Sequence, residues 1–429
     1  MGMNKSETAN VMIGTPKHKP VEVSEKYWWK VVILFTIGWA IMYADRTILN
    51  PVQGIIGQQF GINNAQIGLF SSIFFLAYAI TQIPGGVIGD KYGRKLIVAI
   101  GFIIFGLTTG LSGLAGSFGI FLIFRALTGV GEGFYYGPQY ALSTEALPTK
   151  YLTLGTAIIN SGMALGISGG YLLSSKVVLE DGAHWSKPFF IMAIPTIVVG
   201  VLFYLLLHEN VIRPEDRNKG NEPKKEAASQ PKEKVSVASI FKNKNLLFIF
   251  IMCFCSLYGF FVVTTWLPQF LQVERGYAGT EVGFISSLVP WASIPGALLF
   301  SRLSDKFQKS KPFIFILVPL AAISIIAVAN IQNHTGLIIA LIAYGLFGKL
   351  ALDPIMVAFV TKHAPSVSLG TALSAYNFIG MSSSIIAPYV TGWLVDIVGS
   401  MQISFYISGV LLLIGLLFIA FTKEKPETN

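Results

Sequence analysis

Twelve long apolar runs follow one another along this 429-residue chain, and they constrain its fold more than any other feature. A helix needs about 20 residues to cross a bilayer core of about 30 Å. Lipid offers backbone N–H and C=O groups no partners, so apolar runs of this length must form helices. We expect the spans at residues 29–50, 66–88, 95–114, 118–141, 152–175, 187–207, 246–271, 280–301, 312–330, 335–360, 369–394 and 402–422.

The composition agrees with a chain that faces lipid. Charged residues make up 12% of it, compared with about 25% in an average soluble domain. The 31 Lys and Arg residues outnumber the 22 Asp and Glu residues, but most lie in the tails and in alternate loops, which predicts no nucleic-acid partner. By the positive-inside rule, this distribution places both termini in the cytoplasm. The short external loops favour a bacterial plasma membrane.

A polar stretch at residues 209–245, rich in Lys, Glu, Asn and Pro, divides the chain and is expected to form a solvated cytoplasmic linker. The other expected parts are a cytoplasmic tail at 1–28, a six-helix bundle at 29–208, a second six-helix bundle at 246–422 and a cytoplasmic tail at 423–429.

The two halves repeat each other. Ile67–Ser72 is echoed by Val282–Ser287, and Asp90-Lys91 is echoed at the same spacing by Asp305-Lys306. These echoes indicate a duplicated six-helix unit, and hence an all-α membrane fold with two bundles related by a pseudo-twofold axis. Parallel repeats of this kind place a substrate site between the halves, near the middle of the bilayer.

Several motifs resemble those of known transporters. Gly86–Lys95 is similar to the signature between the second and third helices of the major facilitator superfamily, and Arg125–Gly129 resembles its fourth-helix motif. Tyr43–Arg46, Glu132 and Tyr376–Phe378 resemble the anion:cation symporter family, which includes bacterial sugar-acid transporters and sialin-like lysosomal carriers.

One position departs from that family. Ile48 stands where the family often has Asn, so the identity of the substrate is not carried over from the resemblance.

Six ionisable residues lie well within the spans. An unpaired charge at the bilayer centre costs about 2.5–3.5 kcal/mol on insertion scales, so these residues must pair or face a water-filled cavity. Their formal charges cancel, so structural pairing is a sufficient explanation by itself. They are Asp45, Arg46, Arg125, Glu132, Lys349 and Asp353.

Arg46 is the main candidate for binding an anion, because a guanidinium is always charged and grips a carboxylate with a planar fork. The resemblance implies the same role; the alternative is a permanent salt bridge, for instance with Glu132. The resemblance also implies that Asp45 and Glu132 carry protons. Burial favours the neutral form of a carboxylic acid and a nearby arginine favours the charged form, so substrate binding can switch protonation. The alternative is structural pairing with Arg125 or Arg46.

Lys349 stands at the repeat position of Glu132. It is either a second anion contact or the structural partner of Asp353, which follows four residues later on the same helix. Pro138 and Pro354 lie at nearly matching places and are expected to kink the fourth and tenth spans.

Polar and aromatic residues at similar depth suit a hydroxyl-rich anion, although such residues also join helices in membranes. The candidates for substrate contact are Tyr43, Gln82, Tyr135, Tyr136, Asn160, Ser161, Trp266, Gln269, Tyr376 and Asn377. Asp90 and Arg94, in the loop after the second span, are candidates for gating.

The sequence contains no Walker-type phosphate loop, no HExxH zinc motif and no nucleophile elbow. We therefore expect a monomeric secondary transporter without metal or cofactor rather than an enzyme, with a small organic anion and a proton as its partners. Proton-coupled uptake of a sugar acid or similar carboxylate is favoured. Exchange of organic anions or sugar phosphates, and proton-coupled export, are the alternatives left open.

Overall fold

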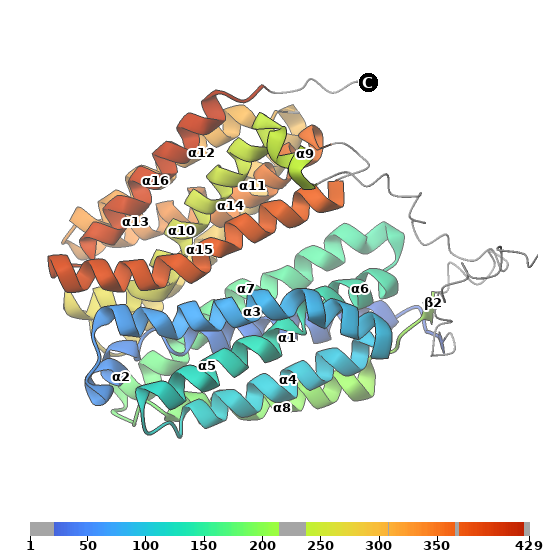
Figure 1. Ribbon diagram of the computed structural model, residues 1–429, viewed down its shortest axis with the longest axis horizontal. Coiled ribbons are helices and arrows are strands. Elements are labelled where there is room, and N and C mark those ends of the chain that lie inside the picture. Colours follow the sequence, from blue (N-terminus) through green and yellow to red (C-terminus); the bar gives the residue numbers. More distant parts are fainter. Residues whose placement is uncertain (1–20, 214–236, 308, 365–368, 424–429) are drawn as a thin grey trace, which may run out of the picture.

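Twelve helices long and apolar enough to cross a membrane are present in the computed structural model, which describes residues 21–213, 237–307, 309–364 and 369–423. The number of spans expected from hydropathy is therefore confirmed. The chain is a multi-pass, all-α membrane protein made of two bundles (Figure 1).

The first bundle, blue to green in Figure 1, contains the spans up to the linker. Its long helix at Asn64–Tyr92 is capped by Asn63, whose side chain accepts a hydrogen bond from the backbone N–H of Gln66 in a capping box. The spans are α1 (Tyr27–Thr47), α3 (Asn64–Tyr92), α4 (Arg94–Ser112), α5 (Phe118–Gly133) with α6 (Tyr136–Ala146), α7 (Leu152–Ser174) and α8 (Lys187–Leu206).

The second bundle, yellow to red in Figure 1, repeats this order. Its spans are α10 (Lys244–Val273), α11 (Gly279–Phe307), α12 (Lys311–Asn330), α13 (His334–Phe347) with α14 (Lys349–His363), α15 (Leu369–Val398) and α16 (Gln402–Ala420).

Two spans are broken in the middle. The fourth span breaks between α5 and α6 at Phe134, four residues before Pro138, as expected for a proline that cannot bond back to residue i−4. The tenth span breaks at Gly348, whose extended backbone separates α13 from α14. This break was not expected from the sequence; α14 continues through Pro354, where the sequence predicts a kink.

The structure adds short elements that hydropathy did not predict. A small helix, α2 (Gln53–Phe60), follows α1, and the π-helical turn η2 (Ser175–Glu180) prolongs α7. Helix η1 (Thr149–Tyr151) precedes α7, and α9 (Val237–Lys242) precedes α10.

Part of the expected linker is ordered against the first bundle. Strand β1 (Val21–Glu22) pairs in parallel with β2 (Val211–Ile212), which joins the amino-terminal segment to the start of the linker. The Glu209 side chain accepts from the backbone N–H of Lys95, at the start of α4. Residues 214–236 of the expected linker lie outside the described residues, and its last part forms α9 and the start of α10. We call this side of the molecule the linker end.

The two bundles are joined at the opposite side, which we call the closed end and define by the start of α3 and the last turns of α15. In Figure 1 the ribbons of α3 and α15 converge there and diverge toward the linker end. The Asp396 carboxylate accepts from the backbone N–H groups of Asn64 and Ala65 at 2.9 and 2.8 Å. These N–H groups have no partner inside α3, and the helix dipole also favours a negative charge at this position. The side chain of Glu180, at the end of η2, accepts a similar hydrogen bond from the backbone N–H of Thr280 at the start of α11, at 3.2 Å.

Two glycines allow α3 and α15 to touch at the closed end. A side-chain carbon on Gly68 would collide with the carbonyl oxygen of Pro388, and one on Gly392 would collide with the carbonyl oxygen of Asn64. The contact between the halves therefore depends on the absence of a side chain at both positions.

We predict that Gly392→Val destabilises the protein by about 1–3 kcal/mol, because the new side chain overpacks a backbone contact. The measurement is thermal unfolding of the purified protein. Gly169→Val is the matched control, since Gly169 also lies in a spanning helix but has open space around it. Equal melting temperatures for the two variants would contradict the packing argument.

Candidate functional site

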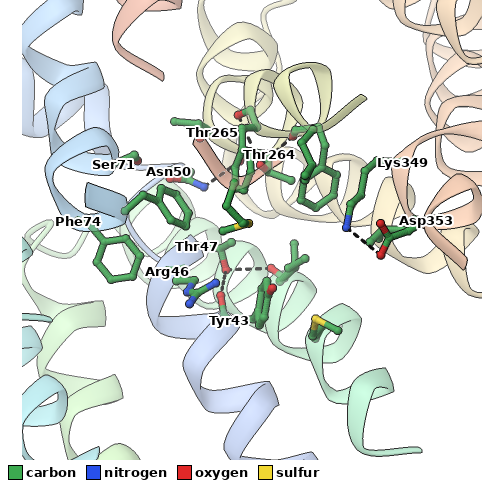
Figure 2. Close-up of a pocket in the computed structure, with 18 of the residues that line it drawn as sticks. Tyr43, Arg46, Thr47, Asn50, Ser71, Phe74, Thr264, Thr265, Lys349 and Asp353 are labelled. Carbon is green, nitrogen blue, oxygen red and sulfur yellow. Dashed lines mark hydrogen bonds and ion pairs between the residues drawn. The ribbon is translucent and has the colours of Figure 1, made fainter. Parts of the chain in front are cut away.

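A cavity of about 140 Å³ lies between the two bundles, halfway along the helices. It is formed by α1, α3, α5 and α7 of the first half and by α10, α14 and α15 of the second (Figure 2). Its lining combines apolar and aromatic side chains with a nearly equal number of polar and charged ones, and such convergent polar groups fix the orientation of a ligand in small-molecule sites. The lining residues are Tyr43, Arg46, Thr47, Asn50, Ser71, Phe74, Phe75, Arg125, Met163, Ile167, Leu257, Phe260, Phe261, Thr264, Thr265, Lys349, Leu350, Asp353 and Met381.

Arg46 lies near the end of α1 and is nine-tenths buried. Its Nε donates to Oε2 of the fully buried Glu132 at 2.6 Å. The rings of Tyr43 and Tyr78 each lie 4.7 Å from the guanidinium carbon, so aromatic faces support the cation. The guanidinium of this cavity-lining residue is thus held at one nitrogen, while its buried Nη2 has no hydrogen-bond partner among the described residues.

Asp45 and Arg125 form a second buried pair, in which Arg125 lines the cavity and Asp45 lies behind it. Asp45 Oδ1 accepts from the Thr109 hydroxyl at 2.6 Å, and its Oδ2 lies 4.0 Å from Arg125 Nη1. The guanidinium of Arg125 also lies over the ring of Phe74, with 4.8 Å from its carbon to the ring centroid. The four charges of the first half therefore form two neighbouring pairs, with Asp45 and Glu132 behind and the arginines at the cavity wall.

The second half contributes Lys349 and Asp353, which lie across the cavity from Arg46 in Figure 2. Lys349 Nζ is 3.5 Å from Asp353 Oδ2, and the Tyr376 hydroxyl donates to Asp353 Oδ1 at 2.9 Å. Both interpretations of Lys349 stay open, because the lysine pairs with Asp353 and also lines the cavity.

Other candidate residues point into helix contacts instead of the cavity. Tyr135 is fully buried and donates to the carbonyl of Phe35, inside an aromatic cluster of the first half. The Trp266 indole donates to the carbonyl of Pro388, which joins α10 to α15. The expected role of these two residues in substrate contact does not fit this geometry, because the polar atom of each already donates to a backbone carbonyl.

Gln269 lies at the closed end, where its side chain accepts from Gln53 Nε2 at 3.1 Å. Asn160 accepts from the Tyr140 hydroxyl at 3.1 Å, and Ser161 bonds within its own helix. Three further candidates, all half-buried, lie outside the cavity lining. These are Gln82, Tyr136 and Asn377.

The two gating candidates lie at the linker end. Arg94 Nε donates to Asp90 Oδ1 at 2.8 Å, and Arg94 Nη1 is 3.9 Å from Glu145 Oε2 at the end of α6. The cluster joins α3, α4 and α6 within the first half.

Several lining residues escaped the sequence analysis. Asn50 donates to the carbonyl of Thr264 at 2.8 Å across the two halves, and its Oδ1 is buried without a partner among the described residues. Ser71, Thr264 and Thr265 supply further polar surface. Asn50 lies four residues after Arg46, about one helical turn, which was a signal that the sequence offered, whereas serine and threonine occur throughout the spans.

Comparison with known proteins gives consistent results. The family model described as Major Facilitator Superfamily matches residues 35–288 and 270–429. The chain is 26% identical to the hexuronate transporter of Bacillus subtilis over 391 residues, covering 88% of this chain and 90% of that protein. It is 25% identical to a probable galactarate/D-glucarate transporter of the same organism over 416 residues, covering 90% and 89%.

Among solved structures, a bacterial homologue of the human lysosomal transporter Spinster superposes with a TM-score of 0.76 at 18% identity. The match covers 92% of this chain and 97% of that one. At this identity the likeness concerns the fold alone.

We predict that Arg125→Met lowers the free energy of unfolding by about 3–5 kcal/mol, because it leaves Asp45 buried without its cation. The double variant Arg125→Met/Asp45→Asn should recover a large part of this loss. Melting temperatures measure both effects, and Lys176→Met, which breaks exposed ion pairs, should cost no more than about 1 kcal/mol. Additive losses in the double variant would show that the two residues do not stabilise each other.

Proposed function

The chain belongs to the Major Facilitator Superfamily, and from this we propose that it is a proton-coupled symporter that takes up an organic anion by alternating access. The favoured substrate is a sugar acid or a similar carboxylate. Proteins of this family are membrane transporters, which confirms the expectation of a transporter rather than an enzyme.

The observation that carries the proposal is the state of Arg46. Its guanidinium is buried, faces the cavity and keeps Nη2 without a protein partner among the described residues. A buried donor of this kind is costly unless something binds to it, and a carboxylate is its best partner. We therefore assign Arg46 to the substrate's carboxylate, with Tyr43 beside it.

The pair of Arg46 and Glu132 supplies a route to proton coupling. When a substrate carboxylate joins the same guanidinium, two negative groups share one cation in a site of low dielectric constant. Like charges at such short range oppose each other strongly, so anion binding and protonation of Glu132 favour each other. Asp45, paired with Arg125 next to them, is the second proposed proton carrier.

The cavity lining and the relatives support the substrate class. Asn50, Ser71 and Thr264 line the same cavity as the cations and can hydrogen-bond to hydroxyl groups. The relatives named above are a hexuronate transporter and a probable galactarate/D-glucarate transporter, and both names denote hydroxylated acids. We extend this class to the present chain as part of the proposal.

The sidedness of the chain is also part of the proposal. We place the linker and both termini in the cytoplasm, because the polar segments on that side contain most of the basic residues. The closed end, with Asp396 on the start of α3, then faces outward. This structure accordingly represents a state closed to the outside.

Exchange of anions is the second candidate function. It is favoured by one observation: the second cation, Lys349, lies in the same cavity as Arg46. An exchanger would not need protonation of Glu132 to complete its cycle, so proton dependence separates the two functions.

The deciding experiment is uptake of labelled D-glucuronate and galactarate into proteoliposomes. We expect uptake to rise several-fold when an inward proton gradient is imposed at fixed internal pH. A gradient without effect, together with exchange against internal substrate, would establish the exchanger instead.

We predict that Glu132→Gln removes stimulation by the proton gradient but leaves exchange of labelled for unlabelled substrate. The amide keeps a hydrogen-bond acceptor for Arg46 but cannot bind and release a proton. Gradient-stimulated uptake by Glu132→Gln at the level of the unmodified protein would exclude Glu132 as the coupling group.

We also predict that Arg46→Lys lowers substrate affinity by about tenfold or more, because lysine keeps the charge but loses the planar fork. Binding is measured by calorimetry on the purified protein. Arg302→Lys is the control, since Arg302 is exposed and lies outside the cavity lining. An equal affinity in both variants would remove Arg46 from the binding site.

A further inference from the structure

Lys349 lies where it can bind the far end of a substrate held by Arg46. It is the first residue of α14 and follows directly on the break at Gly348. It lines the same cavity as Arg46, and Figure 2 shows the two side chains on opposite sides of it, Arg46 from the first half and Lys349 from the second. The cavity therefore has a cation at each side.

The ion pair between Lys349 and Asp353 is loose. Its N–O distance is 3.5 Å, longer than the usual 2.7–3.2 Å of a hydrogen bond and longer than the 2.6 Å between Arg46 and Glu132. The two side chains are 15% and 36% exposed, whereas Glu132 is fully buried. Lys before Asp is also the less favourable order for a pair four residues apart on a helix. This pair is thus easier to open than the buried pair of Arg46 and Glu132.

Asp353 stays anchored if Lys349 moves. Its second carboxylate oxygen accepts from the hydroxyl of Tyr376 at 2.9 Å, and its exposed fraction leaves it in contact with the cavity. Turning Lys349 toward a ligand therefore does not strand a buried, unpaired carboxylate, which would be the main cost of breaking a buried pair.

The charges at the cavity wall favour a ligand with two acidic groups. Of the charged residues that line it, Arg46, Arg125 and Lys349 are cations and only Asp353 is an acid. Asp45 and Glu132 lie behind the arginines and are fully buried. The start of α14 adds the partial positive charge of a helix amino terminus beside Lys349.

We propose that the substrate is a dianion whose acidic groups bind at opposite ends of the cavity, one on Arg46 and the other on Lys349. In the absence of ligand, Asp353 takes the place of the second acidic group on Lys349. The bound dianion bridges the two halves, and the hydroxyl groups of its chain meet Asn50 and the neighbouring polar residues. This inference rests on the proposed function and narrows its substrate class.

The test compares six-carbon acids that differ in one carboxylate: galactarate with galactonate, D-glucarate with D-gluconate, and adipate with hexanoate. Dissociation constants are measured by calorimetry on the full-length protein. We expect at least one diacid to bind about tenfold or more tightly than its mono-acid partner. In Lys349→Gln this preference should fall to about twofold, with the mono-acid unaffected.

Two further variants make the result specific. Lys349→Arg keeps the charge and should keep the preference for the diacid. If it does, the loss of preference in Lys349→Gln is due to the lost charge and not to misfolding caused by any substitution at this position. Lys176→Gln, at the closed end and more than half exposed, should behave like the unmodified protein.

Equal binding of the diacid and the mono-acid to the unmodified protein would overturn this inference and leave the proposed function standing. Equal weakening of both acids by Lys349→Gln would overturn it as well, since Lys349 would then serve the structure only. Failure of all six acids to bind would count against both the inference and the proposed function.

Discussion

The salt bridge between Arg46 and Glu132 is the interaction on which the rest of this molecule depends. A charge at this depth is tolerated only with a partner, and here the partner occupies one nitrogen and leaves another without a bond. Twelve helices, two of them broken, position this incomplete pair at the wall of a small cavity. In the function that we propose, the stability of the bundle and the binding of an anion thus depend on the same group.

The two halves contribute differently to the site although they arise from a repeat. The first half supplies two buried pairs, Arg46 with Glu132 at 2.6 Å and Arg125 with Asp45 at 4.0 Å. The second supplies one more exposed pair, at the position that corresponds to Glu132. An acid in one half is thus matched by a base in the other. In the function that we propose, one half would set the charge balance while the other would select the length and charge of the ligand.

Hydropathy alone could predict the number and order of the spans, because lipid imposes helices on long apolar runs. The six charges could be found for the same reason, since each is costly in lipid. The cavity residues that α10 contributes could not be predicted. This helix contains a stretch with a mean hydropathy of 2.6, and its few polar residues, such as Thr264 and Thr265, form no continuous stripe that marks its inner face. Tyr135 and Trp266 were placed in the site on residue type, and only packing reveals that other helices use their polar atoms. The break at Gly348 was missed because Pro354 gave the stronger local signal.

The breaks in the fourth and tenth spans divide each half into a part near the closed end and a part near the linker end. A continuous helix transmits bending along its axis, whereas a break such as Gly348 acts as a pivot. Lys349 and Asp353 belong to the arm beyond this pivot, while α13 remains packed against α11 and α12. Rotation of one short arm would carry a whole ion pair away from Arg46. Because Lys349 and Asp353 share one short helix, any rearrangement at the Gly348 break would change both ends of this ion pair relative to Arg46 at once.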